Sequence, residues 1–414
     1  MNQHQYQASP FVHLKPYALA EHLDSFVENL ALVGYCPLAI SGYAASVSHF
    51  GTWLHRKNIP VEGINNVVVL RFAQHRCGCP GGRHHKHLSR RYVNRVRRFT
   101  RYLQERGLVP LPLPKTREAT ASILDGFGQW LLDHKGLSPR TVATYERPLR
   151  RILPLLGDDP NQYGAALVRR VVREQSERYG CSEAKHVISA LRAFLRFLAM
   201  KGCCDAALVA AVPTVAQWRL SSLPRYIESA DIDRIIDSCD CTRPLGVRNR
   251  AILLLLARLG LRASDIVMMS IDDLDWRGAT VRVCGKSRRD VRLPLPQDAG
   301  DAVLEYLEHA RPHATSERLF LCVPAPFRPL GNSSVVSAVV RAAVMRAGID
   351  DPPSCGTNLL RHSAATTMLR AGATLDAVST VLRHRSTDTT AHYAKVDVVA
   401  LCALAPPWPE GASC

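Results

Sequence analysis

The sequence lacks the features of several common protein classes. Its 414 residues contain no apolar run of about 18 residues, so we expect no transmembrane helix. The first residues show no basic stretch followed by an apolar one, so we expect no secretory signal peptide. Neither a P-loop pattern (GxxxxGKS or GxxxxGKT) nor a GxGxxG pattern occurs, which excludes nucleotide binding of those two kinds.

Acidic residues are scarce relative to basic ones. Asp and Glu number 36 against 53 Lys and Arg, which gives a formal net charge of +17. Such an excess is typical of proteins that bind a polyanion, most often nucleic acid, although a basic surface kept for solubility is the alternative. The 13 cysteines are an odd number scattered over a long chain, which favours reduced thiols in the cytoplasm over a disulfide framework.

The first half of the chain contains a weak internal repeat. The offset between matching residues is 101 or 102 early in the repeat and 95 later, so the two copies differ in length. The matching pairs include Leu23 with Leu124, Phe26 with Phe127, Tyr43 with Tyr145, Phe99 with Phe194 and Gly107 with Gly202. Two copies are too few for a solenoid, so the repeat predicts two similar small domains.

Both copies have the periodicity of helices and carry arginine runs. Val187, Leu191 and Leu198 fall on one helical face, and Ser138 followed by Pro139 is a typical helix start. The arginines are Arg90, Arg91, Arg95, Arg97, Arg98, Arg101 and Arg106 in the first copy, and Arg140, Arg147, Arg150 and Arg151 in the second. Because few acids lie among them, the runs favour contacts with phosphates over a merely solvated face.

These patterns predict a mainly helical chain of three domains. We place helical DNA-binding units at 14–110 and 116–205, joined by a stiff proline-rich linker, and a mixed α+β domain at 220–404. In the last domain, stretches 279–284 and 291–295 alternate between apolar and polar residues around a set of turn residues. They predict a small antiparallel hairpin.

Four short segments of the third domain carry residues suited to phosphoryl chemistry. Arg262 lies in GLRASD, Lys286 lies in the hairpin turn, Arg361 lies in NLLRHSAAT, and His384 is followed by Tyr393 nine residues later. In this order, the segments resemble the boxes of the tyrosine recombinases, the phage-integrase-like site-specific recombinases. The resemblance covers about 224–400 strongly. It extends to the helical units, in which GLSPRTVATYERPLRR and ALRAFLRFL resemble the family's core-binding, SAM-like domain.

The chemistry of these residues agrees with the resemblance. Two guanidinium groups, Arg262 and Arg361, can clamp the non-bridging oxygens of a phosphodiester. A Tyr393 phenolate can form a covalent bond that keeps the phosphodiester energy, with the arginines and His384 supplying a field that favours ionisation. Lys286 is the candidate general acid for the leaving 5′-oxygen.

The resemblance implies further properties of the reaction and of the assembly. Tyr393 would form a 3′-phosphotyrosine and free a 5′-hydroxyl, and neither metal nor ATP would be required as a cofactor. Four protomers would exchange strands of double-stranded DNA through a Holliday junction, in some cases together with other recombinases. The apolar segment 396–404 would pack on a neighbouring protomer or on its own domain.

Four positions depart from the family pattern or lie beside it. Asn358 stands where the family commonly has His or Lys; it can hydrogen-bond a phosphate oxygen but cannot shuttle a proton. Asp265 replaces the usual Glu, and we expect it to orient Arg262 or His362. Arg383 replaces the usual Gly before His384, and it either adds a phosphate contact or lies on the surface. His362 is either a supporting donor or a structural histidine.

A loop rich in Cys, His and Gly interrupts the first helical unit. Cys77, Cys79, His84 and His87 are weak candidates for zinc ligands, because CxC is not the usual CxxC spacing. The alternative is a basic loop that contacts DNA.

The sequence therefore predicts a recombinase or integrase of a mobile element. A catalytically silent DNA-binding protein and a type IB topoisomerase-like enzyme are the alternatives.

Overall fold

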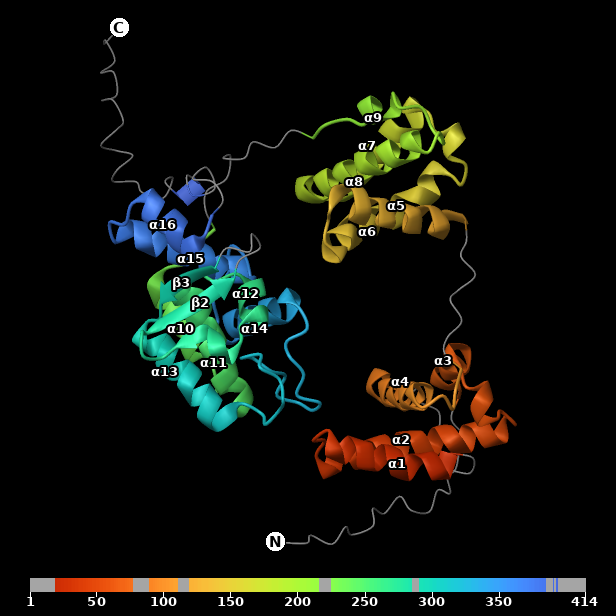
Figure 1. The fold of residues 1–414 in the computed structure, drawn as a ribbon, viewed down its shortest axis with the longest axis horizontal. Helices are drawn as coiled ribbons and strands as arrows, with labels where there is room; N and C mark the ends of the chain where they lie inside the picture. Colours follow the sequence, from red (N-terminus) through yellow and green to blue (C-terminus); the bar gives the residue numbers. More distant parts are fainter. Residues whose placement is uncertain are drawn as a thin grey trace. The chain divides into compact units, whose positions relative to one another are not determined.

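The computed structural model describes residues 19–76, 89–110, 119–215, 225–284, 290–384, 390 and 392–393 (Figure 1). Several of the predictions above lie outside these residues. They concern Lys286, the loop residues Cys77, Cys79, His84 and His87, and the segment 396–404. Within the described residues, no helix is long and apolar enough to cross a membrane.

The first helical group is built on an aromatic core. Its helices are α1 (Ala20–Leu32), α2 (Pro37–Arg56), α3 (Asn66–Gln74) and α4 (Arg90–Glu105), with a short 3-10 turn at Val61–Gly63. Phe26 on α1 and Phe99 on α4 are buried, with their ring centroids 5.1 Å apart. Because each helix presents one apolar face to these rings, the opposite faces are left to polar and charged residues.

The second helical group has the same kind of core. Its helices are α5 (Ala119–Lys135), α6 (Pro139–Leu156), α7 (Ala165–Arg178), α8 (Cys181–Met200) and α9 (Leu208–Ala211), with a 3-10 turn at Pro160–Gln162, and residues 112–221 form one compact unit. Phe127 and Phe194 are buried with their ring centroids 5.4 Å apart. They are the counterparts of Phe26 and Phe99 in the repeat, so each core holds an aromatic pair at matching positions.

The helix start predicted in the second group is also confirmed. Ser138 lies just before α6 and accepts a hydrogen bond at 3.3 Å from the backbone N–H of Thr141, and Pro139 is the first helical residue. The cap satisfies one of the backbone donors that a helix start leaves open.

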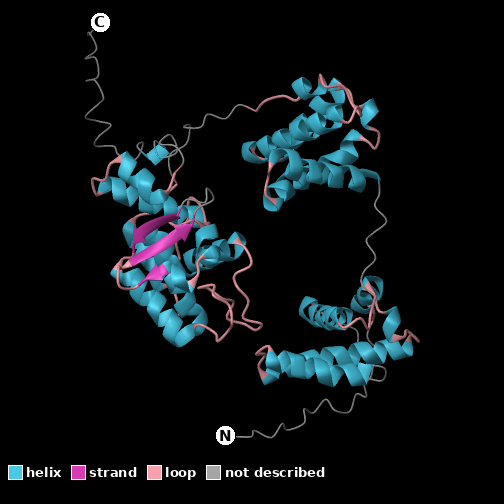
Figure 2. Cartoon of the chain, in the orientation of Figure 1, coloured by secondary structure: helices cyan, strands magenta, loops and turns pink. Residues whose placement is uncertain are grey.

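The C-terminal part combines helices with a small sheet (Figure 2). Its elements are α10 (Ser229–Asp237), α11 (Pro244–Leu259), α12 (Ala263–Met268), β1 (Leu274–Asp275), β2 (Thr280–Cys284), β3 (Asp290–Pro294), α13 (Gln297–Glu305), α14 (Ser333–Arg346), α15 (Thr357–Arg370) and α16 (Leu375–Leu382). Short turns at Ile271–Asp273 and Tyr306–Ala310 complete them.

The sheet confirms the predicted hairpin and adds a strand to it. β2 and β3 pair antiparallel with Val281 opposite Leu293, and the two-residue β1 pairs with β2, giving the order β1-β2-β3. Val281, Val283 and Leu293 are buried in the same core cluster as α11, of whose 16 residues 11 are buried. A mainly helical fold with a small antiparallel sheet is therefore confirmed.

Candidate active site

Arg361 is held at the C-terminal end of α11. This helix ends at Gly260, whose φ of +57° is left-handed, and a Cβ there would lie 2.5 Å from a side-chain carbon of Leu382. The Gly260 carbonyl accepts a hydrogen bond from Nη1 of Arg361, and the Leu382 carbonyl accepts one from Nη2. Arg361 is only 6% exposed, so two backbone carbonyls fix its guanidinium inside the protein.

Arg262, Asp265 and Arg383 form a closed ring of contacts. The backbone N–H of Arg262 donates to Oδ2 of Asp265 at 2.8 Å, and Asp265 forms an ion pair with the Arg383 guanidinium. The Arg383 carbonyl accepts from Nη2 of Arg262 at 3.0 Å, which closes the ring. Asp265 thus orients Arg262 as expected, through its backbone, but its second contact is Arg383 and not His362.

Of the two alternatives for Arg383, the structure excludes the surface position. Its side chain is 7% exposed and that of Asp265 is 3% exposed, so the ion pair is buried. Arg383 has φ of +54°, a left-handed backbone conformation that glycine adopts without strain. Within the described residues, Nε and Nη1 of Arg383 have no acceptor, so the other alternative, a phosphate contact, stays a hypothesis.

Tyr393 lies in the same place, between two histidines. It is 2% exposed and packs with Leu382 and Val378. The His384 ring is parallel to the Tyr393 ring, with centroids 6.2 Å apart, and its Nδ1 lies 2.8 Å from Oγ1 of Thr390. Nδ1 of His362 lies 2.7 Å from the Tyr393 hydroxyl oxygen.

Burial dominates the electrostatics of the site. It raises the pKa of Tyr393 above its usual 10, although Arg361 and Arg262 act to lower it. Burial, then Arg361, Arg262 and His362, lowers the pKa of His384 to about 4, so this histidine is neutral at pH 7. A neutral His384 adds no positive charge at Tyr393, contrary to our expectation, and the field that favours the phenolate comes from Arg361 and Arg262.

The same effects act on the other two ionisable groups. Burial, and next Arg262, lowers the pKa of Arg361 to about 10, which still leaves it charged at neutral pH. Burial lowers the pKa of His362 to about 4, with His392, Arg361 and Arg225 acting in the same direction.

The structure therefore brings together Arg262, Arg361, His384 and Tyr393, four of the six predicted catalytic residues. Asn358 lies one turn before Arg361 on α15 and is exposed. The close partner of Tyr393 is His362, a contact that the sequence did not indicate. Its only signal in the sequence was its place directly after Arg361.

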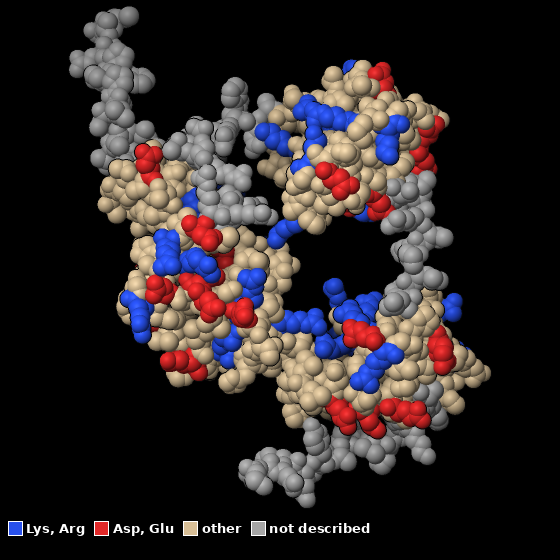
Figure 3. Space-filling view, viewed as in Figure 1, with Lys and Arg blue, Asp and Glu red and all other residues tan. Residues whose placement is uncertain are grey.

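A second candidate site is the arginine-rich surface of α4. Arg90, Arg91, Arg97 and Arg101 are exposed. Figure 3 shows Lys and Arg gathered over this helix, whereas Asp and Glu gather along α1 at the other edge of the group. Among the described residues, these arginines form no ion pair with a carboxylate.

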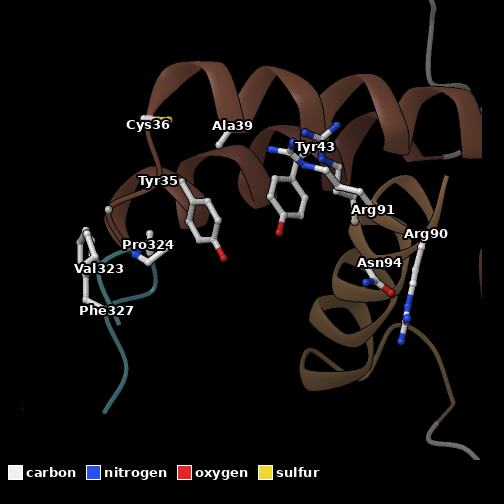
Figure 4. A pocket seen from close by; sticks show the side chains of 13 residues that line it. Tyr35, Cys36, Ala39, Tyr43, Arg90, Arg91, Asn94, Val323, Pro324 and Phe327 are labelled. Atoms are coloured by element: carbon white, nitrogen blue, oxygen red, sulfur yellow. The ribbon is translucent and has the colours of Figure 1, made fainter. Parts of the chain in front are cut away.

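The rings of Tyr35 and Tyr43 lie beside part of this surface (Figure 4). The Arg98 guanidinium lies 5.0 Å from the ring centroid of Tyr35, and that of Arg95 lies 5.6 Å from Tyr43. Arg95 also donates to the Gly42 carbonyl at 2.9 Å. Rings and a carbonyl hold these side chains without neutralising them, so the surface keeps its positive charge.

The arginines of α6 are arranged differently. Arg150 pairs with Glu146 at 2.9 Å and Arg151 with Glu183 at 2.6 Å, whereas Arg140 and Arg147 are exposed. Part of the predicted phosphate-binding charge on this helix is therefore already paired with carboxylates.

Comparison with known proteins identifies the family. Residues 225–398 match the phage integrase family, and residues 124–202 match the phage integrase N-terminal SAM-like domain. A protein of Sinorhizobium fredii named "Putative integrase/recombinase y4rA" is 36% identical over 397 residues, which cover 94% of this chain and 95% of that one. The chain thus belongs to the phage integrase family of tyrosine recombinases.

Other relatives and solved structures agree with this membership. Tyrosine recombinase XerD of Lacticaseibacillus casei is 28% identical over 277 residues, covering 66% of this chain and 92% of that protein. The XerH recombinase bound to its difH substrate has a TM-score of 0.58 at 16% identity, covering 72% of this chain and 99% of that chain. A lambda integrase tetramer bound to a Holliday junction has a TM-score of 0.54 at 16% identity, with 74% and 88% coverage. These two structures support the same fold.

Proposed function

We propose that this protein is a site-specific DNA recombinase that cuts and rejoins DNA through a 3′-phosphotyrosine at Tyr393, for integration or transposition of a mobile element. The observation that carries the proposal is the meeting of Arg262, Arg361, His384 and Tyr393 in one buried site. They come from three separated segments of the chain, and such a convergence has no evident use in a protein that only binds DNA.

The geometry supports a defined role for each group. Arg361 cannot swing away because two backbone carbonyls hold it, so its guanidinium is preorganised for a phosphate. Arg262 is fixed through the ring with Asp265 and Arg383. The negative charge of a bound phosphodiester would reduce the repulsion between these positively charged arginines. Their positive charge would also stabilise the ionised form of the attacking tyrosine. Lys286 would protonate the leaving 5′-oxygen.

The proposal also covers the DNA partner and the assembly. We assign DNA-binding units to 14–110 and 116–205 and the catalytic domain to 220–404. The exposed arginines of α4 support the first assignment, because guanidiniums that no carboxylate of the described residues neutralises suit a phosphate backbone. The active protein would be a tetramer on duplex DNA in the cytoplasm. The lambda integrase structure, described as a tetramer on a Holliday junction, supports this by analogy.

A nicked suicide substrate from the ends of its own element tests the proposal. When the short fragment after the cleavage site diffuses away, the covalent intermediate accumulates. We expect a covalent protein–DNA product from the native protein and none from Tyr393→Phe, which keeps the ring but has no nucleophile. A native protein that binds this DNA without forming an adduct would instead be a catalytically silent binding protein. An adduct followed by relaxation of supercoils without strand exchange would favour a topoisomerase-like enzyme.

A further inference from the structure

The nucleophile candidate has one close polar neighbour among the described residues. Nδ1 of His362 lies 2.7 Å from the Tyr393 hydroxyl oxygen, and the two ring centroids are 5.4 Å apart. This distance is that of a good hydrogen bond. With the imidazole proton on Nε2, Nδ1 is an acceptor and the tyrosine hydroxyl donates to it.

The other two candidates for a proton acceptor are poorly placed. Asn358 is exposed, and an amide has no basic lone pair with which to take a proton. The His384 ring lies parallel to the Tyr393 ring at 7°, and its Nδ1 is engaged with Thr390. The His384 ring thus lies parallel to the Tyr393 ring with centroids 6.2 Å apart, whereas Nδ1 of His362 lies within hydrogen-bond distance of the hydroxyl.

We infer that His362 is the general base of strand cleavage, an inference that rests on the proposed function. The amide of Asn358 cannot take up this proton. As the Tyr393 oxygen bonds to phosphorus, its proton moves to Nδ1 of His362. The bond from phosphorus to the 5′-oxygen breaks, and that oxygen takes a proton from the general acid. The phosphodiester keeps its single negative charge, and in rejoining His362 returns the proton to Tyr393.

The surroundings of His362 suit this part. The charged and titratable groups that face it are Arg361 beside it on α15, Arg225, His384, His392 and Tyr393. Burial, then His392 and the two arginines, lowers its pKa to about 4, so the imidazole is neutral and can accept a proton at pH 7. A DNA phosphate bound at Arg361 would add negative charge beside the imidazole and make it a stronger base.

The test is single-turnover cleavage of the suicide substrate by His362→Ala. We expect adduct formation to slow by roughly 10²–10⁴-fold, the usual contribution of a general base. Imidazole added to the buffer should restore part of the rate to His362→Ala and leave the native protein unchanged. The variant's rate should also rise with pH up to the tyrosine pKa, because hydroxide then takes the proton, whereas the native rate should be flat above about pH 6.

Two controls keep the result decisive. His309→Ala removes an exposed histidine of the same part of the chain and should cleave at the native rate. His362→Gln retains a polar side chain; if the base assignment is right, it should bind DNA normally and still show the pH-dependent loss. A His362→Ala protein that cleaves at the native rate, or one slowed without imidazole rescue or a changed pH profile, overturns the inference. Absence of any native adduct would instead overturn the proposed function.

Discussion

The chain uses arginine in two contrasting ways. At the active site, Arg361 is 6% exposed and bonded to two backbone carbonyls, and Arg383 is buried in an ion pair with Asp265. On α4, Arg97 and Arg101 are exposed, and no carboxylate of the described residues neutralises them. The buried arginines of the active site are held in place and shielded from water. The exposed arginines of α4 are surrounded by water and free to move.

This difference teaches which task each set suits. A buried guanidinium already oriented by carbonyls loses little freedom when a phosphate arrives, and its field acts through a medium of low polarity. An exposed guanidinium contributes little binding free energy through any single phosphate. Several exposed guanidiniums together release counterions from DNA and hold a duplex whatever its sequence. The buried set therefore suits catalysis, and the surface set suits affinity.

Breaking the buried ion pair should have the largest effect. Asp265→Ala leaves Arg383 buried without its carboxylate and removes the acceptor for the Arg262 N–H, so we expect a loss of about 3–5 kcal/mol in the free energy of unfolding. Arg383→Gly should cost less, because the Arg262 contact with Asp265 survives and relief of the left-handed backbone returns about 1 kcal/mol. Urea unfolding of both variants measures the order, and a greater loss from Arg383→Gly would contradict it.

Replacing the clamp itself should separate catalysis from binding. Arg361→Lys keeps one charge but loses the planar fork and at least one of the two carbonyl contacts, so we expect cleavage to slow by roughly 10²–10³-fold. DNA affinity should change by less than about tenfold, because the duplex is held mainly elsewhere. Single-turnover cleavage and equilibrium binding on the same DNA give both numbers. Equal losses in cleavage rate and DNA affinity would contradict the division of arginines into a buried set for catalysis and a surface set for affinity.

Changes on α4 should have the smallest effect, and it should appear in the salt dependence. Arg97→Ala combined with Arg101→Ala should lower the slope of log affinity against log salt by about 2, roughly 0.9 per phosphate contact, whatever the DNA sequence. The matched control on α6 is Arg150→Ala combined with Arg151→Ala, which should change the slope less because Arg150 is already paired with Glu146 and Arg151 with Glu183. Binding measured over a range of salt concentrations tests this, and a larger change from the α6 control would reverse our assignment.

The fold was largely predictable because its signals are local. The helical periodicity, the Ser138 cap and the alternation in the hairpin each depend on residues close in sequence, and the paired cores around Phe26 and Phe127 followed from the repeat. β1 was missed because two residues are too short to show alternation.

The site was only partly predictable, because its decisive contacts join distant segments. The order of the boxes pointed to Arg262, Arg361, His384 and Tyr393, but no local pattern reveals that His362 contacts the hydroxyl. Arg383 pairs with a residue 118 positions away, and only the folded chain shows the carboxylate beside it. The neutral state of His384 likewise follows from its burial in the folded chain. The polar residues around it in the sequence give no sign of that burial.

The most direct test of the account is to identify the side chain that carries DNA. The covalent product on the suicide substrate can be digested with nuclease and protease, and the modified peptide sequenced by mass spectrometry. We expect a nucleotide joined through its 3′-phosphate to Tyr393, with a free 5′-hydroxyl on the released strand. A nucleotide on any other side chain, or a 5′-phosphate linkage, would contradict it.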